Sequence, residues 1–540
     1  MTIATIPFPH REKASFVPKP NVYIGTLGVF LGAGIATLSA RLVSIGLPDL
    51  RGALGLGVDE AAWIPTAYNM GLMFMGPFSV YFGGLLGVRR VLLATATVFV
   101  LVSLLLPLSP NLGVMLALQT VSGLSSGTFY PLTMSYALRG LPLRYTVYGI
   151  GAYSLDIIAA LNVGMPLEAW YIEHWSWHWI FWQSALLTPL MMACIYVAIP
   201  NPPPRPPGSR PTVSWAGFLY ASLGLSLLYG ALEQGERLDW LRSGVFVGML
   251  ATGLFLIAAA LIRRWFVPNP MVRLSFLWNR NTLIIGAGLF SFRFTLLAIS
   301  LLIPAYLAAI QHYRPLETGP VLLWVMVPQI AMGLVTAQLM HWIDGRLIFA
   351  LGFAIVAFAC HMNAQLTSAW ADVNFWWPQL TLAIGLSFTF VGLVGMIAQQ
   401  GITTGALARP FDILTYSAYF HTVRLFGGEV GVAFMQRVVD VREKFYSNMI
   451  GQHVEAGTWL ADERLRMLSG GLAPGSSGSD ESHARALVVL AGQIKQQAYT
   501  LSYSDGFLVI AWLCVGMMIL IACMRPMKIY FDSPSREPPR

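Results

Sequence analysis

The stretch from Thr282 to Ile310, which reads TLIIGAGLFSFRFTLLAISLLIPAYLAAI, decides the fold of this chain. It is apolar almost throughout, and Arg293 is its one charged residue. A helix needs about 20 mostly apolar residues to cross the hydrocarbon core of a bilayer, which is about 30 Å thick. The stretch therefore predicts a membrane-spanning helix that carries a positive charge inside the bilayer.

Similar apolar runs occur along the whole chain of 540 residues and predict fourteen membrane-spanning helices. The runs begin near Tyr23, Ile64, Val91, Val114, Thr146, Trp179, Ala216, Val245, Thr282, Pro320, Leu347, Pro378, Ile413 and Gly506. Apolar residues make up 56% of the sequence and charged residues only 11%, with a mean hydropathy of +0.63. A soluble domain carries about 25% charged residues. The composition therefore predicts an all-α polytopic membrane protein and excludes soluble enzymes, nucleic-acid-binding proteins and disordered proteins.

The cysteines and short motifs of the sequence indicate neither a metal site nor an enzyme. Cys194, Cys360, Cys514 and Cys523 all lie inside apolar runs, which fits neither a disulfide framework nor the spacing of metal ligands. The sequence contains no metal-binding motif, phosphate-binding loop, nucleophile elbow or nucleotide-binding signature. We therefore expect no cofactor and no ATP-driven pumping, so that an ion gradient would supply the energy for any transport.

The basic residues of the predicted loops are distributed unevenly between the two sides of the membrane. If the N-terminus is cytoplasmic, nineteen of the thirty-three lysines and arginines fall in cytoplasmic segments, and the short outer loops hold only Arg51, Arg237, Arg242 and Arg314. Lysine and arginine are enriched in the cytoplasmic loops of membrane proteins. We therefore expect both termini in the cytoplasm, and we attribute the net charge of +8 to topology rather than to a nucleic-acid partner.

Two polar segments interrupt the series of spans. Residues 201–211, NPPPRPPGSRP, predict a stiff and extended linker after the sixth span. The segment from Gln436 to Ser504 lies between the last two spans, on the outer side, and contains a Gly/Ser-rich patch between two stretches of helical character, 438–449 and 482–500. We expect a partly helical external excursion there, and a linker that is disordered throughout is the alternative.

A series of short motifs follows in order along nearly the whole chain. It comprises Leu47-Pro48, Trp63 to Tyr68 (WIPTAY), 177–181 (WHWIF), 232–240 (LEQGERLDW), 269–276 (NPMVRLSF), 279–281 (NRN), and Arg424 with Gly428 and Gly431. This series resembles the EmrB/QacA type of major facilitator transporters, the fourteen-span drug:proton antiporters. WIPTAY is similar to the WxxTAY signature of that family, and Arg424 with its two glycines is similar to the RxxxGxxG of span thirteen.

The resemblance implies a major facilitator fold of two six-helix bundles with two inserted helices between them. The substrate cavity would lie between the bundles at mid-membrane, and rocking of one bundle against the other would give alternating access. The expected segments are a cytoplasmic tail (1–22), an N-terminal six-helix bundle (23–200), a Pro-rich linker (201–215), two inserted helices (216–262), a cytoplasmic loop (263–281), a C-terminal six-helix bundle that includes the outer loop 436–504 (282–525), and a cytoplasmic tail (526–540).

The sequence departs from the family at the positions that the family uses for proton coupling. The loop between spans two and three, GGLLGVRR, keeps Arg89 and Arg90 but lacks the acidic residue of the family motif. In span one, Leu38-Ser39-Ala40-Arg41 stands where the family has an acid, and in span four Gln119, followed by Ser122 and Gly123, stands where it has an arginine. The antiporter motif of span five survives only as Gly164-Met165-Pro166-Leu167-Glu168. At these positions the chain lacks the residues of the family motifs, so the resemblance gives only weak support for proton coupling.

Charged residues within spans are costly, at about 3 kcal/mol or more, and are functional candidates by default. Six of them occur: Arg41, Asp156, Glu168, Arg293, Arg424 and Glu429. At a rise of about 1.5 Å per residue, Asp156 lies about 15 Å into its helix, and Arg293 and Arg424 lie at a similar depth in theirs. We therefore expect three charges from both bundles near the midplane, with the other three in the outer parts of their helices.

Each of these residues allows more than one interpretation. Asp156 would be the proton carrier that replaces the missing acid of span one, or the partner of an arginine in a permanent ion pair. Arg293 and Arg424 would hold anionic groups of a substrate or pair with Asp156, and Arg424 would otherwise serve helix packing. Arg41 would be a polar group of the cavity or a snorkelling side chain.

Two further side chains are also open to more than one interpretation. Glu168 would act in the pathway or lie at the membrane interface. His421, one turn before Arg424, would titrate near neutral pH or remain neutral and bonded to a backbone carbonyl.

The leading hypothesis is a transporter in the inner membrane of a bacterium that exports hydrophobic or amphiphilic small molecules in exchange for protons. Export of a specific organic anion or siderophore-like metabolite is the alternative within transport, because three intramembrane arginines match three acids. A membrane scaffold or channel is the alternative of another class. Members of this type often work with a periplasmic adaptor and an outer-membrane channel, for which the outer excursion offers a docking surface.

Overall fold

The computed structural model describes residues 21–140, 143–199, 215–266, 275–406, 410–454, 457–472 and 479–526, and every regular element within these ranges is a helix. The N-terminal tail through residue 20, the Pro-rich linker through residue 214, residues 267–274 of the predicted cytoplasmic loop and the C-terminal tail from residue 527 lie outside the described residues. The expectation of an all-α chain is confirmed for the described part.

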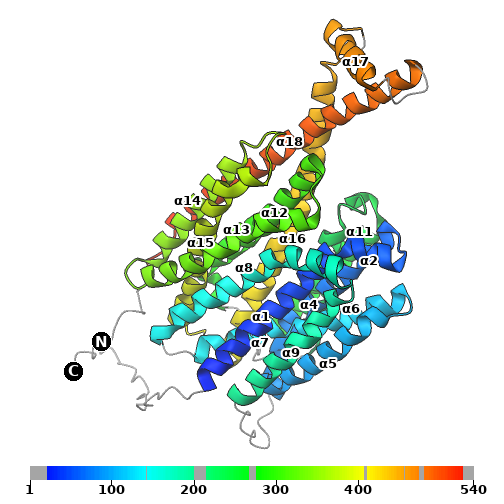
Figure 1. Ribbon diagram of the computed structural model, residues 1–540. Coiled ribbons are helices and arrows are strands. Elements are labelled where there is room, and N and C mark those ends of the chain that lie inside the picture. Colours follow the sequence, from blue (N-terminus) through cyan, green and yellow to red (C-terminus); the bar gives the residue numbers. More distant parts are fainter. Residues whose placement is uncertain are drawn as a thin grey trace, which may run out of the picture.

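The first half of the chain forms one bundle of long helices (Figure 1). Its helices are α1 (Asn21–Ile45), α4 (Trp63–Leu86), α5 (Val88–Leu105), α6 (Leu112–Ser126), α7 (Phe129–Gly140), α8 (Leu143–His174) and α9 (Trp179–Ala198). The short helices α2 (Leu47–Leu54), α3 (Val58–Ala61) and η1 (Leu106–Leu108) connect them. α6 and α7 follow each other as one candidate span, so that the bundle has six long members.

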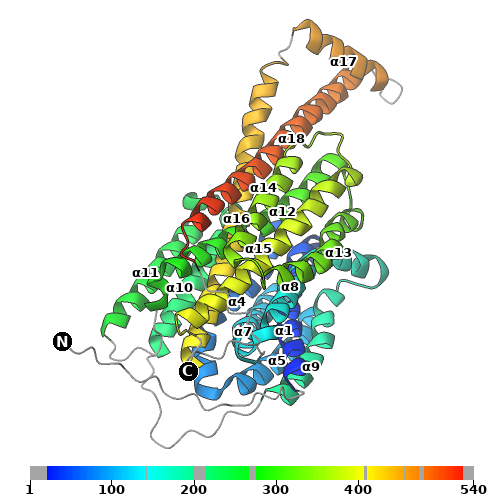
Figure 2. The same ribbon diagram turned by 90° about the vertical axis from the view of Figure 1, so that its left-hand side faces the viewer.

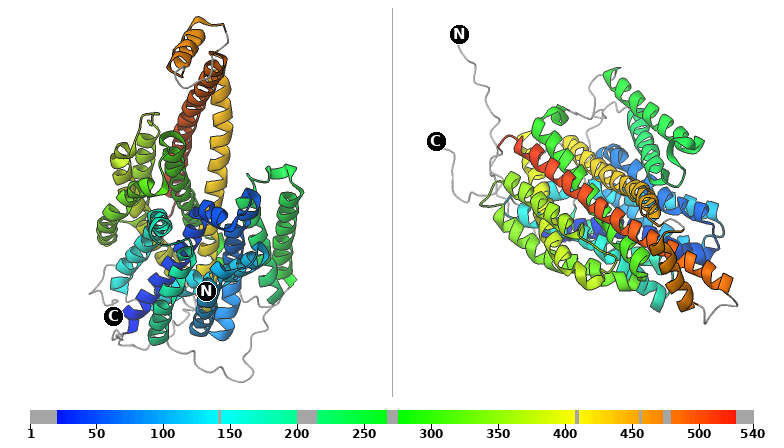
Figure 3. Two further views of the ribbon diagram at one scale, coloured as in Figure 1. Left: turned by 45° about the vertical axis from the view of Figure 1, so that its right-hand side comes forward. Right: turned by 90° about the horizontal axis from the view of Figure 1, so that it is seen from above.

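The second half forms a second bundle beside the first (Figure 2). It consists of α12 (Arg280–Gln311), α13 (Pro315–Leu339), α14 (Gly345–Asn363), α15 (Trp376–Thr403), α16 (Pro410–Gly451) and α18 (Ser479–Ala522), with the short helices η3 (Ser275–Trp278) and η4 (Asp372–Phe375). The two helices between the bundles, α10 (Trp215–Gln234) and α11 (Gly244–Phe266), pair with each other at the periphery, and α10 packs against α4 (Figure 3). The turn η2 (Trp240–Arg242) joins them. The two-bundle fold with inserted helices is confirmed.

Eleven of the helices within the described residues are long and apolar enough to cross a membrane. α4, α8 and α16 are also long but are not among these eleven, and two of them carry intramembrane charges: Asp156 and Glu168 in α8, and Arg424 and Glu429 in α16. The chain is thus a multi-pass membrane protein, whereas the count of fourteen spans stays a prediction.

Burial separates the helices that contact other helices from those at the edge of the molecule. The most apolar part of α15 is 83% buried, and that of α11 is 11% buried. α15 therefore occupies the interior of the second bundle, and α11 leaves its apolar side chains, such as Phe255 and Ile262, for contact with lipid.

Glycines bring α4 and α6 into backbone contact. A Cβ atom on Gly71 would lie 2.5 Å from the carbonyl oxygen of Thr120, and one on Gly123 would overlap the carbonyl group of Tyr68. A side chain at either position would force the two helices apart. This is the close approach that small residues allow in membrane helices.

The last two long helices extend beyond the bundle (Figures 1 and 2). α16 and α18 project together from one end of the molecule, and α17 (Trp459–Leu472) packs against α18 at the tip. At the base, Asp505 of α18 accepts hydrogen bonds from Arg442 (2.5 Å) and Tyr446 (2.8 Å) of α16. The stretches 438–449 and 482–500 are thus parts of continuous helices. We call this projection the excursion and the end of the molecule that bears it the excursion side.

Candidate functional site

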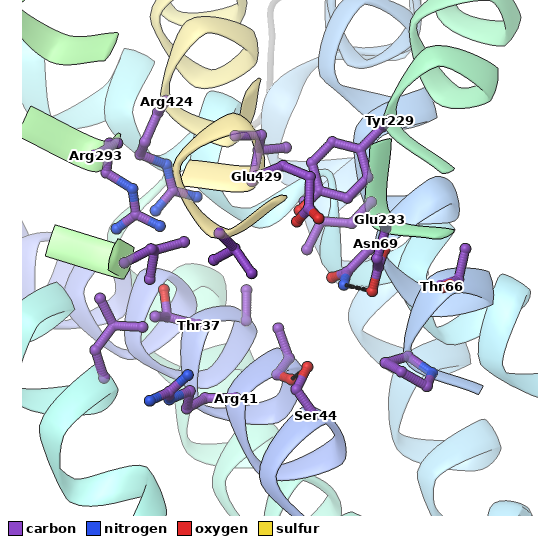
Figure 4. A pocket seen from close by; sticks show the side chains of 18 of the residues that line it. Thr37, Arg41, Ser44, Thr66, Asn69, Tyr229, Glu233, Arg293, Arg424 and Glu429 are labelled. Atoms are coloured by element: carbon purple, nitrogen blue, oxygen red, sulfur yellow. Dashed lines mark hydrogen bonds between the residues drawn. The ribbon is translucent and has the colours of Figure 1, made fainter. Parts of the chain in front are cut away.

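A cavity of about 670 Å³ lies between the two bundles and is closed on a third side by α10 (Figure 4). Most of its lining comes from α1, α4, α10, α12 and α16, with single residues from α2, α6, α7 and α8. Cavities of about 300–1,000 Å³ hold drug-sized ligands. The lining runs from Arg293 in the middle of α12 to Arg237 and Gln436 on the excursion side.

Three arginines form one wall of the cavity, which we call the basic wall: Arg41 of α1, Arg293 of α12 and Arg424 of α16 (Figure 4). Arg293 and Arg424 are each only 5% exposed. Among the described residues, no carboxylate oxygen lies within 4.0 Å of any of their nitrogens, and Nε and Nη1 of Arg293 have no hydrogen-bond partner. Two buried arginines and the half-buried Arg41 therefore line one space without a carboxylate partner among the described residues.

Packing and backbone contacts hold the arginines in place. The guanidinium of Arg424 lies over the ring of Tyr130, 4.0 Å from its centroid, and His421 packs against the same ring at 4.9 Å. Arg41 donates a hydrogen bond from Nη2 to the backbone carbonyl of Ser300, at 3.3 Å, so it links α1 of the first bundle to α12 of the second.

Two glutamates form the opposite side of the cavity, which we call the acidic wall: Glu233 of α10 and Glu429 of α16 (Figure 4). Asn69 of α4 donates a hydrogen bond to Oε1 of Glu233 at 3.0 Å, whereas the Oε2 atom is buried and has no partner among the described residues. Glu429 is 7% exposed, and Tyr229 of α10 lies beside both carboxyl groups. No basic side chain of the described part lies within 4.0 Å of either glutamate.

Glu233 is a cavity residue that the sequence analysis missed. It belongs to the stretch LEQGERLDW, and α10 continues through Gln234 and so keeps Glu233 in its last turn. Tyr229 and Glu233 are four residues apart and therefore share one face of the helix. That spacing at the end of an apolar run was the signal that could have placed the carboxyl in the membrane.

The excursion-side rim of the cavity ties the inserted pair of helices to the first bundle. Arg237 forms an ion pair with Asp59 at 2.8 Å and lies over the ring of Trp63, 5.4 Å from its centroid. Gln234 donates hydrogen bonds to the hydroxyl of Thr66 (2.5 Å) and to the carbonyl of Ala62 (2.9 Å). The end of α10 thus contacts the WIPTAY segment and Ala62, the residue that precedes it.

The structure does not bring Asp156 and Glu168 into the cavity lining. Asp156 packs against α1, where a Cβ on Gly34 would lie 2.8 Å from its Oδ1 atom, and no cation of the described residues lies within 4.0 Å of it. The ion pair with an arginine, which was one of the two predicted roles of Asp156, is therefore not formed with Arg293 or Arg424 in this structure. Glu168 was expected close to water, yet it is 1% exposed and lies beside Gly46 at the excursion-side end of α1.

The remaining motif positions lie at helix crossings and surfaces. Tyr68 donates a hydrogen bond to the backbone carbonyl of Ala36 at 3.2 Å, and Gln119 is buried, with 1% of its surface exposed. The guanidinium of Arg89 lies 4.6 Å from the centroid of the Tyr196 ring, and the neighbouring Arg90 is exposed. A Cβ on Gly164 would lie 2.7 Å from the Cγ atom of Arg41, so this glycine makes space for an arginine of the basic wall. Three further positions contact the second bundle's α12 or α13: Pro166 against Gly319, Gly428 against Leu297, and Gly431 against Phe294.

The two-bundle fold and the cavity between its halves agree with a comparison to known families. The sequence pattern of the Major Facilitator Superfamily matches residues 29–431. The chain belongs to this superfamily. Among curated proteins, the chain is similar to the Colistin resistance protein EmrB of Acinetobacter baumannii, which is 23% identical over 505 residues, 92% of this chain and 95% of that protein. The Fatty acid resistance protein FarB of Neisseria gonorrhoeae is 22% identical, over 93% of this chain and 96% of its own length.

Two further comparisons extend the superfamily assignment. The Multidrug export protein EmrB of Haemophilus influenzae is 21% identical over 93% of this chain and 95% of its own length, so the resemblance to the EmrB type is confirmed. Among solved structures, the human organic anion transporter MFSD10 (TETRAN) shares the fold, with a TM-score of 0.53 at 13% identity over 92% of this chain and all of that one. These relatives are transporters, which agrees with the expectation that this major facilitator protein is not an enzyme.

Proposed function

We propose that this chain is a secondary active transporter that exports amphiphilic small molecules across the inner membrane of a bacterium in exchange for protons. The observation that carries the proposal is the cavity between the bundles, which is lined by charged side chains from both bundles and from α10. A scaffold protein has no need to gather buried charges around a cavity, because each of them is costly in the membrane. Rocking of the bundles around this cavity would give alternating access.

The basic wall favours a second candidate substrate, an organic anion. Arg293 and Arg424 are buried and without a carboxylate partner, so an anionic group that enters the cavity would supply the missing counter-charge. The apolar lining residues Leu72, Leu161 and Leu297 would contact the hydrophobic body of the same molecule. An amphiphile with an anionic head group satisfies both parts of the lining.

The export function is tested with tritiated taurocholate, which has an apolar steroid body and a permanently ionised sulfonate. Proteoliposomes with an acidic interior should accumulate it, because protons leaving the vesicle would drive it inward. The exposed Arg242, which pairs with Asp239 at the surface, provides a matched control as Arg242→Gln. Retention of full accumulation by the Arg293→Gln variant would contradict a role of the cavity in transport.

The proposed orientation has both termini in the cytoplasm and the excursion outside. The excess of lysine and arginine in the segments assigned to the cytoplasm supports it. A reporter enzyme that works only in the cytoplasm, fused near Gly475, should therefore be inactive. An active fusion at that position would overturn the orientation.

A periplasmic adaptor, joined to an outer-membrane channel, is the proposed partner of the excursion. α16 and α18 carry the excursion well beyond the bundle, and Trp459, Leu460 and Val488 are each more than two-thirds exposed there. Apolar side chains exposed to water in such a projection support docking to another protein. Deletion of residues 465–481 should abolish efflux from whole cells and spare transport in vesicles. Equal loss in both assays would count against docking.

A further inference from the structure

We propose that Glu233 and Glu429 together bind the coupling proton, so that the inserted helix α10 takes part in energy coupling. The inference rests on the proposed exchange of substrate for protons and names the site at which the proton binds. Nothing in the family resemblance points to α10 for this role, because the acid that the family uses lies in span one. The argument depends on the surroundings of the two carboxyl groups, on the helices that carry them and on the contrast with Asp156.

The surroundings of the pair lack a cation that would neutralise it. The groups facing it are Asn69 and Thr66 of α4, Tyr229 of α10 and, across the cavity, Arg293 of α12 and Arg424 of α16 (Figure 4). Arg237, one turn after Glu233, is already paired with Asp59. Two carboxylates that line one cavity repel each other, and binding of one proton reduces this repulsion.

The hydrogen bonds leave one position free for that proton. Oε1 of Glu233 accepts from the Asn69 amide at 3.0 Å, and Oε2 is buried without a partner. A buried polar atom without a partner is costly. A proton on Oε2 would turn this atom into a donor toward the cavity, where the carboxylate of Glu429 lies. Binding of one proton from water would change the charge of the pair from −2 to −1, and its release on the opposite side would restore the −2 state.

The two carboxyl groups belong to different moving parts. α10 is bound to α4 of the first bundle through Ser226, which donates to the carbonyl of Met70 at 2.8 Å, and through Gln234. Glu429 is part of α16 in the second bundle. Rocking of the bundles would therefore change the separation of the two carboxyl groups and with it their affinity for the shared proton. A ligand shifts a conformational equilibrium only if its affinity differs between the two states, and this arrangement supplies that difference.

Asp156 lacks this property. Its carboxyl group packs against Gly34, and both residues belong to the first bundle, in α8 and α1. A motion of one bundle against the other leaves that contact unchanged. Asp156, which its predicted depth in the membrane favoured, is thus less suited to coupling than Glu233 and Glu429, which lie on opposite sides of the boundary between the bundles.

The first test needs no substrate. Dicyclohexylcarbodiimide reacts with protonated carboxyl groups in apolar surroundings, and mass spectrometry of the labelled full-length protein would map the site. We expect labelling at Glu233 or Glu429, loss of it in the double variant Glu233→Gln/Glu429→Gln, and no labelling of the exposed Glu173. Labelling at Asp156 alone, or an unlabelled pair, would overturn the proposal.

The second test separates coupling from transport. Taurocholate counterflow between equal pH values reports movement through the cavity, and accumulation against a gradient reports coupling to protons. Glu233→Gln and Glu429→Gln should reduce accumulation by about tenfold or more while counterflow persists, and the control Glu173→Gln should resemble the parent protein. Accumulation at the parent level in both variants would overturn the inference, whereas an absence of counterflow in the parent protein would count against the proposed function alone.

Discussion

The basic wall and the acidic wall face each other across one cavity, yet they hold their charges in different ways. The arginines are fixed by an aromatic ring, a backbone carbonyl and close helix packing, with no charged partner. The glutamates are flanked by an amide and a phenol, which can adapt to a carboxyl group with or without a proton. The basic wall is therefore built to keep its charge, and the acidic wall is built to change it.

The separation of the walls explains how one small cavity can serve two ligands. If the arginines and glutamates formed ion pairs, the charges would cancel and neither a substrate nor a proton would be needed. Among the described residues, no such pair lies within 4.0 Å. The basic wall can therefore bind an anionic group, and the acidic wall can bind a proton.

The largest effect should come from removing a charge of the basic wall. Arg293→Gln should weaken binding of taurocholate by about 10- to 100-fold, because a hydrogen bond to a charged group contributes about 1.5–3 kcal/mol. Scintillation proximity binding to the purified protein measures this. Arg242→Gln, altered at the surface, should bind as the parent does, and an equal loss in both variants would mean that the assay reports stability instead.

A smaller effect should follow when the basic wall is displaced without loss of charge. Gly164→Ala would place a Cβ 2.7 Å from the Cγ atom of Arg41, so the arginine stem has to shift. We expect about tenfold weaker binding of taurocholate, within the range of about 1–3 kcal/mol typical of overpacking, while the ratio of accumulation to counterflow stays unchanged. Gly248→Ala, which has open space around it, is the matched control. A change in that ratio would show that the walls are not independent.

The acidic wall should respond when its neutral hydrogen-bond donor is removed. Asn69→Leu deletes the bond to Oε1 of Glu233 and should reduce accumulation about fivefold, since such a bond contributes about 1 kcal/mol. Binding of taurocholate should remain, because Asn69 contacts no arginine of the basic wall. Weaker binding with unchanged accumulation would reverse the assignment of the two walls.

The smallest effect should come from the ring beneath Arg424. Tyr130→Leu removes a cation–π contact with a distance of 4.0 Å and should weaken binding about threefold, in line with about 0.5–1 kcal/mol for such contacts. Tyr130→Phe keeps the ring and should bind as the parent protein does. If the phenylalanine variant lost as much as the leucine variant, the hydroxyl rather than the ring would be responsible.

The sequence predicted the fold well because hydrophobic length is a local property of the chain. Runs such as Thr282 to Ile310 lie in long helices, and depth along a helix follows from its rise per residue. Five of the predicted pathway residues line the cavity for this reason: Arg41, Arg293, Arg424, His421 and Glu429.

Rotation about the helix axis could not be predicted in the same way. Asp156 lies deep in α8, but its side chain faces Gly34 of the same bundle, and only the packing of α8 against α1 determines that direction. Glu233 was missed for a related reason. Its carboxyl enters the cavity because Gln234 and Ser226 attach α10 to α4, and such contacts between distant segments leave no periodic signal in the sequence.

A parallel measurement of counterflow and accumulation in the Arg293→Gln and Glu233→Gln variants would test whether the two walls have separate roles. The same preparation of proteoliposomes serves for both assays, with taurocholate as the probe and Glu173→Gln as the control. The separation of the walls predicts that Arg293→Gln loses counterflow and accumulation together, whereas Glu233→Gln loses accumulation and keeps counterflow. Loss of both activities in Glu233→Gln, or retention of both, would contradict it.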